Sequence, residues 1–122
     1  MKEEVKNWWE RAKKDLNTAK NSLNSGDYYA TSLFSQQSAE KALKAIQLKK
    51  ENKIIKTHDL LFLAKKLEIP ENLIENCRKL KPVYIETRYP DASGGFKDFS
   101  KVDGEEDVKL AKEVLIWIEK NL

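Results

Sequence analysis

The chain has 122 residues, of which 40% are hydrophobic and 35% charged, a composition typical of one globular domain over residues 1–122 and not of a disordered or fibrous protein. Its 23 basic and 20 acidic residues are intermixed and leave a net charge of only +3, which gives weak support for a nucleic-acid partner. The single cysteine, Cys77, excludes an intramolecular disulfide, and the lack of a signal sequence or of an apolar run of about 18 residues predicts a cytoplasmic protein with no membrane span.

The first two predicted helices form a hairpin. Gly26 is suited to the left-handed conformation that ends a helix, and Asp27 can then cap the next one. Residues 28–50 are apolar around much of their circumference, so we expect the second helix to be the most buried. In the first segment, apolar residues recur at spacings of three and four, the period of one helix face: Val5, Trp8, Ala12, Leu16, Ala19 and Leu23.

The tryptophans of the first helix are adjacent in the sequence. Trp8 and Trp9 point about 100° apart on a helix, so they cannot both face the same core line. We therefore expect one of them to be free to meet a partner chain.

Two further helices are predicted in the middle of the chain. Thr57 is a good N-cap for a short third helix over residues 58–67. Pro70 then opens a fourth, because its missing amide would have been unpaired in the first turn. Tyr89 is expected to mark the end of this helix, since the residue before Pro90 is pushed out of helical geometry.

The last third of the chain is predicted to be a loop and one more helix. Residues 91–107 contain the pair Gly94-Gly95 and no sustained period, which indicates a surface loop. Acidic residues from Glu105 onward favour the positive end of a helix dipole and predict a fifth helix there. No segment alternates like a strand, so the fold class is all-α, a five-helix up-and-down bundle with a four-helix core plus a short helix.

Polar residues interrupt the helix that we expect to be most buried. Gln37, Lys41 and Lys44 lie on one face, and Glu40 can pair with Lys44 at a spacing of four. One interpretation is a solvated stripe with one helix-surface ion pair. The other is the wall of a polar cleft, because buried polar groups need partners.

His58, the only histidine, precedes Asp59 at the start of the predicted third helix. Adjacent residues on a helix do not face each other, so the two do not form an oriented acid-base pair by sequence alone. One interpretation is a histidine of the capping region. The other is an anion site at the helix start, of the kind that a phosphate favours, in which His58 takes part. One histidine without an acidic cluster argues against a metal site.

The stretch "YIETRYPD", residues 84–91, places Arg88, Tyr89 and Asp91 at the end of the fourth helix. Arginine is a planar donor fork suited to carboxylates and phosphates, and tyrosine offers a ring for stacking. We prefer an internal tie, with Arg88 bound to Asp91 or to a carboxylate on the second helix. A nucleotide contact is the alternative.

Three stretches together resemble one family. "DYYATSLFSQQSAEKALKAI", "KTHDL" and "YIETRYPD" are similar, in order and spacing, to the HEPN (higher eukaryotes and prokaryotes nucleotide-binding) domain family. The resemblance implies a five-helix bundle that is commonly dimeric, found with minimal nucleotidyltransferases in toxin-antitoxin-like pairs. Many members are metal-independent RNases with an Arg, four to six residues, then a His. This chain lacks that motif, so we assign no catalytic residue.

The resemblance also implies a set of candidate site residues. We expect Lys41, His58 and Arg88 to converge on a cleft that takes a nucleotide phosphate, with Tyr89 near the base or sugar. No cofactor is required, and an ATP-like nucleotide is the expected ligand. The full candidate nucleotide-binding set is Gln37, Glu40, Lys41, Lys44, His58, Asp59, Arg88, Tyr89 and Asp91.

Three functions are therefore carried forward. The favoured one is a nucleotide-binding or partner-binding module, a homodimer that associates with a minimal nucleotidyltransferase. The second is a metal-independent RNase whose non-standard site uses His58 and Arg88, with RNA as the partner. The third is a purely structural dimeric interaction module.

Overall fold

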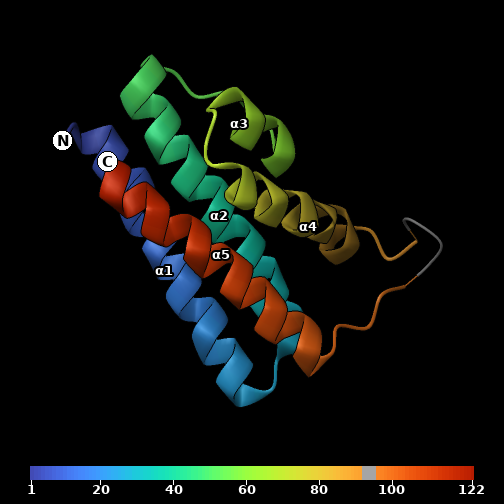
Figure 1. The fold of residues 1–122 in the computed structure, drawn as a ribbon. Coiled ribbons are helices and arrows are strands. Elements are labelled where there is room, and N and C mark those ends of the chain that lie inside the picture. Colours follow the sequence, from blue (N-terminus) through green and yellow to red (C-terminus); the bar gives the residue numbers. More distant parts are fainter. Residues whose placement is uncertain (92–95) are drawn as a thin grey trace.

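The computed structural model describes residues 1–91 and 96–122, and within these it contains helices and no strand. The prediction of an all-α, five-helix bundle is confirmed. Gly94 and Gly95, the pair on which the predicted surface loop rests, lie outside the described residues. The helices, shown in Figure 1, are α1 (Glu3–Ser25), α2 (Tyr28–Glu51), α3 (Leu60–Lys66), α4 (Glu71–Arg88) and α5 (Lys101–Asn121).

Helix α2 is the centre of the bundle. Figure 1 shows α1, α2 and α5 lying side by side, with α3 and α4 against the other side of α2 and the two termini close together. Among the described helices, α2 alone contacts all four others. Most of its residues are buried, as the sequence predicts. Within the described residues, no helix combines the length and the apolar character needed to cross a bilayer.

The α1–α2 hairpin forms as predicted. Gly26 has φ 85°, in the left-handed region that glycine adopts without steric cost, and its amide donates to the Leu23 carbonyl at 3.3 Å. Asp27 then caps α2, because its carboxylate accepts a hydrogen bond from the Ala30 amide at 3.3 Å.

The core face of α1 contains Trp9 and not Trp8, which was expected there. Trp9 is only 7% exposed and lies in the core with Val5 and Ala12, whereas Trp8 is partly buried at its edge. The predicted stripe through Trp8 was wrong at this position. Either tryptophan fits the helical period. The spacings from Val5 to Ala12 are three and four through Trp8, and four and three through Trp9.

Helices α3 and α4 begin and end close to the predicted positions. Asp59, rather than Thr57, caps α3, with its carboxylate accepting from the Phe62 amide at 3.1 Å. Helix α4 starts directly after Pro70 and ends at Arg88, with Tyr89 as its extended C-cap, as expected for a residue before proline.

Helix α5 begins earlier than predicted, at Lys101. Ser100 and Asp103 form a reciprocal capping box, which starts the helix inside the stretch predicted to be loop. Gly104 therefore lies in the first turns, where α5 approaches α2 closely. A Cβ at this position would lie 3.2 Å from Cγ2 of Thr31, a tight contact that a larger residue could make only if the Thr31 side chain shifted by a few tenths of an ångström.

One buried acid lies where α5 packs on α2. Desolvation raises the pKa of Asp107 to about 6, although the Ser32 hydroxyl and the Lys97 ammonium act to lower it. Between pH 4 and pH 6 the folded protein thus binds a proton that the unfolded chain has released. The contribution of Asp107 to stability is complete below about pH 4 and is lost as the pH rises through about 6.

We expect Asp107→Asn to flatten the pH dependence of stability. Its free energy of unfolding should fall by about 2 kcal/mol less than that of the wild type between pH 4.5 and pH 7.5, because the amide does not ionise. Urea unfolding at the two pH values measures this difference. Glu105→Gln, an exposed control on the same helix, should leave the wild-type dependence unchanged. Parallel curves for Asp107→Asn and wild type would contradict the assignment.

Candidate functional site

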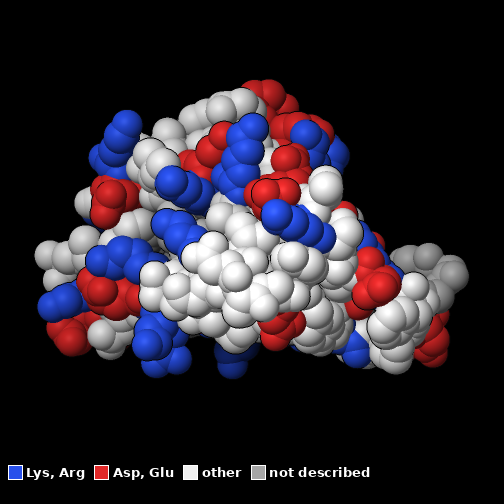
Figure 2. Space-filling model, turned by 90° about the horizontal axis from the view of Figure 1, so that it is seen from below, with Lys and Arg blue, Asp and Glu red and all other residues white. Residues whose placement is uncertain are grey.

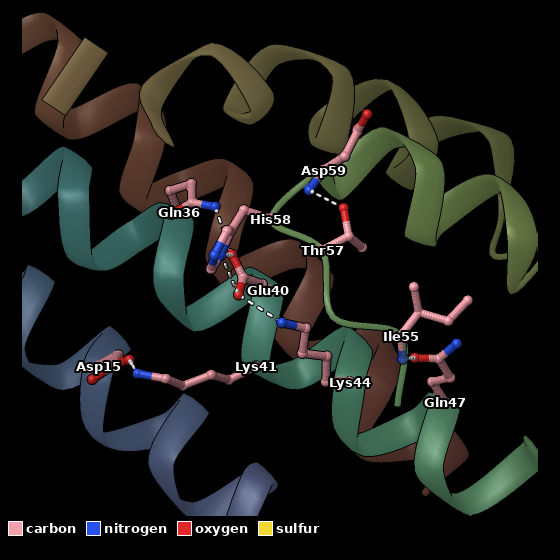
Figure 3. Close-up of polar contacts among 10 residues, drawn as sticks. All are labelled: Asp15, Gln36, Glu40, Lys41, Lys44, Gln47, Ile55, Thr57, His58 and Asp59. Atoms are coloured by element: carbon pink, nitrogen blue, oxygen red, sulfur yellow. Dashed lines mark hydrogen bonds and ion pairs between the residues drawn. The ribbon is translucent and has the colours of Figure 1, made fainter. Parts of the chain in front are cut away.

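Glu40 is the polar hub on the inner part of α2 (Figure 3). Its carboxylate accepts from Nζ of Lys44 at 2.9 Å and from Nε2 of Gln36 at 3.2 Å, and Nδ1 of His58 lies 3.1 Å from both of its oxygens. The predicted Glu40–Lys44 pair is present. It is buried rather than solvated, with the two side chains only 11% and 7% exposed, which agrees with the cleft-wall interpretation.

The linker between α2 and α3 is held at several points. The Ile55 amide donates to Oε1 of the buried Gln47 at 3.1 Å, and the Asp59 amide donates to Oγ1 of Thr57 at 3.1 Å. Asp59 also pairs with Lys81 of α4 at 3.2 Å. These contacts aim the His58 side chain at α2 (Figure 3).

The pKa of Asp59 reflects this anchoring. Partial desolvation acts to raise it, but the hydrogen bond from the Phe62 amide and the Lys81 ammonium together lower the pKa of this carboxyl below its ordinary value. The acid thus supports the start of α3 in its ionised form.

Tyr84 separates His58 from Arg88. The His58 and Tyr84 rings are stacked, with centroids 4.2 Å apart and planes inclined by 18°, and Cζ of Arg88 lies 4.0 Å from the Tyr84 centroid. Both groups are too close to the ring to share one face, so they occupy opposite faces. The expected tie between Arg88 and a carboxylate was wrong: within the described residues Arg88 forms no ion pair and rests on an aromatic ring.

Tyr84 was not among the predicted site residues. Its position four residues before Arg88 on a helix is the signal that could have found it, since residues at this spacing are neighbours on a helix surface.

The remaining predicted residues do not converge on one cleft. Lys41 points away from Glu40 and pairs with Asp15 of α1 (Figure 3). Gln37 is half-buried on α2, and Tyr89 and Asp91 are exposed beyond the end of α4. The expected meeting of Lys41, His58 and Arg88 is therefore wrong.

A hollow of about 450 Å³ opens beside the Glu40 hub. We call it the Trp8–His58 hollow, and it is lined by Trp8, Lys44, Ile54, Lys56, Thr57 and His58. Nζ of Lys44 lies 5.7 Å from the centre of the Trp8 ring, and none of the described residues that line the hollow is acidic. Three basic side chains and one aromatic ring thus face the same space.

A second, smaller hollow of about 270 Å³ adjoins the first at Trp8. We call it the Arg11–Lys41 hollow, and it is lined by Asn7, Trp8, Arg11 and Lys41. Sequence reasoning missed Arg11 and Lys56 and placed Trp8 instead of Trp9 on the core face, because which residues meet at the edge of the bundle depends on how the linker packs against α1.

The described residues that line the two hollows form no cluster of metal ligands. Across residues 1–91 and 96–122, no three His, Cys, Asp or Glu side chains gather closely enough to hold an ion. The sulfur of Cys77 is buried in the core, and desolvation raises the pKa of its thiol to about 12, so it is neither a ligand nor a nucleophile at neutral pH.

We expect Glu40→Gln to destabilise the fold by about 3 kcal/mol or more, because it leaves the buried Lys44 ammonium without a counter-charge. Denaturant unfolding at pH 7 measures the loss. Glu75→Gln removes the same charge from an exposed pair with Arg78 and should cost less than about 1 kcal/mol. Equal losses for both variants would show that burial of the Glu40 pair has no energetic consequence.

Comparisons with known proteins agree with this architecture. The HEPN domain model matches residues 5–121. The chain is similar to the crystal structure of TT1696 from Thermus thermophilus, with 34% identity and a TM-score of 0.86 over 97% of this chain and 98% of that one. No curated protein matches the chain.

Two further crystal structures are similar. An archaeal HEPN homologue has 27% identity and a TM-score of 0.81 over 99% of this chain and 98% of its own. A HEPN domain protein from Thermotoga maritima has 25% identity and a TM-score of 0.75 over 93% and 95% of the two chains. Because the family model spans nearly the whole sequence and the solved structures match the fold over almost their full length, the chain belongs to the HEPN domain family.

Proposed function

We propose that the protein binds a nucleotide in the Trp8–His58 hollow. The observation that carries this proposal is the combination of one partly buried indole with Lys44, Lys56 and His58 around a single space. An aromatic ring can stack on a base, and clustered cations attract phosphate. The volume of about 450 Å³ lies within the range of small-molecule sites.

The Glu40 hub orients two of these side chains, Lys44 and His58, beside the hollow. One of the three Lys44 donors is taken by Glu40, which leaves two for a ligand. Since a carboxylate only accepts hydrogen bonds, Nδ1 of His58 carries the proton between them. In the imidazolium form, Nε2 is then a second donor. His58 is 52% exposed in its side chain, so this edge is within reach of a ligand.

The other predicted functions have different support. An RNase site built from His58 and Arg88 gains little, because Glu40 holds Nδ1 of His58 and the Tyr84 ring stands between the two. Association with a partner, either a second copy or a minimal nucleotidyltransferase, is favoured by a separate observation at the end of the bundle where α2 and α5 begin and α4 ends.

This end of the molecule is rich in exposed apolar residues. The Tyr29 hydroxyl donates to the Thr87 carbonyl at 2.7 Å, so α2 begins against the end of α4. Figure 2, seen from below, shows uncharged residues gathered in the middle of the face and charged ones around them. Such a patch is typical of a protein interface. The exposed apolar residues of these segments are Tyr29, Ile85, Tyr89, Phe96 and Val102.

Calorimetric titration tests nucleotide binding. We expect saturable heat with ATP and with AMP, without and with magnesium, because Lys44, Lys56 and His58 can contact the phosphate directly. Lys56→Ala should weaken binding roughly tenfold, since a hydrogen bond to a charged group is worth about 1.5 kcal/mol. Lys53→Ala, an exposed lysine of the same linker outside the hollow, is the matched control. Absence of saturable heat with the wild type would overturn the proposal.

Light scattering after size exclusion tests partner association in its simplest form. We expect the mass of a dimer for the wild type and of a monomer for Val102→Glu, because Val102 is 72% exposed and a charge there would be buried by an interface. Ile116→Glu places the same charge on an exposed residue farther along α5 and should leave the mass unchanged. A monomeric wild type would leave a separate protein as the only partner for this face.

A further inference from the structure

The Arg11–Lys41 hollow is not used by a mononucleotide seated beside His58. It lies between α1 and α2, and its one shared member with the Trp8–His58 hollow is Trp8. The two hollows are lined from different elements, the larger one mainly by the linker before α3 and the smaller one by α1 and α2. A ligand that reaches both must therefore pass over the indole.

Each hollow contains a cation that is free to meet a ligand. One cation of each hollow already forms an ion pair: Lys41 in the smaller hollow pairs with Asp15, and Lys44 in the larger one pairs with Glu40. Arg11 and Lys56 form no ion pair with any residue in the described parts of the chain, and both are exposed. The structure thus presents two separate anion-attracting places rather than one.

The indole between them is available because its neighbour fills the core. Trp9 occupies the core position of this helical turn, and Trp8, about 100° around the helix, is only partly covered. Stacking on an aromatic ring tolerates any base, since every base has a π-face. The order along the surface is cationic hollow, indole, cationic hollow.

We propose that the ligand is a nucleoside with phosphate on both its 5′ and its 3′ oxygen, with the base on Trp8 and one phosphate in each hollow. This inference rests on the proposed nucleotide binding and adds the second phosphate. A free nucleoside bisphosphate and an internal nucleotide of a single strand present the same chemistry. Arg11, with its planar donor fork, is the specificity residue for the second phosphate.

The test compares three probes by calorimetry at one fixed salt concentration: AMP, adenosine 3′,5′-bisphosphate and a short oligoadenylate. For the wild type we expect the second phosphate to tighten binding at least tenfold over AMP. Arg11→Ala should abolish this gain while leaving the dissociation constant for AMP unchanged. Lys20→Ala, an exposed cation elsewhere on α1, should keep the full gain.

The outcomes separate this inference from the function on which it rests. Equal affinity for AMP and the bisphosphate, or a gain that survives Arg11→Ala, would overturn the inference and leave nucleotide binding intact. No binding of any probe would overturn both. Oligoadenylate that binds more tightly than the bisphosphate would support the inference with a strand as the source, and weaker or equal binding would support it with the free nucleotide.

Discussion

The polar contacts of the buried Glu40 carboxylate are the interaction on which the rest of the structure depends. An unpaired charge at this depth would cost several kcal/mol, so the fold must supply partners from more than one element. Lys44 and Gln36 come from the same helix, but His58 comes from the linker. Satisfying this one carboxylate therefore fixes where the linker crosses α2, and with it the place where α3 begins.

The same helix contains the other polar groups that position the linker. Gln47 is fully buried and accepts a hydrogen bond from the Ile55 amide. The Ser35 and Ser38 hydroxyls donate hydrogen bonds to backbone carbonyls of the preceding turn. These residues explain how a helix that contacts every other helix can be rich in polar side chains. The polar groups of Ser35, Gln36, Ser38, Glu40, Lys44 and Gln47 have partners within α2 or in the linker, so much of α2 is buried without being apolar.

Some aromatic side chains fill the core, and others lie at the surface of the bundle. Trp9 fills the core, whereas Trp8 lies at the junction of two cationic hollows. Tyr84 lies between His58 and Arg88. One face of its ring stacks on the His58 ring, and the other face contacts the Arg88 guanidinium. The arginine and the tyrosine of "YIETRYPD" thus have different surroundings: Arg88 lies on Tyr84, and Tyr89 is exposed as the cap of α4.

The sequence by itself determined the helices, most of their ends and the Glu40–Lys44 pair, because periodicity, capping and spacings of four are local properties of the backbone. It could not decide between Trp8 and Trp9, since both fit a helical period, nor find the capping box that starts α5 before Gly104. Only the tertiary structure decided that Lys41 turns to Asp15, that Tyr84 separates His58 from Arg88, and that Arg11 and Lys56 flank one indole. These contacts join residues far apart in the chain, and their geometry is set by the packing of α1 and the linker against α2.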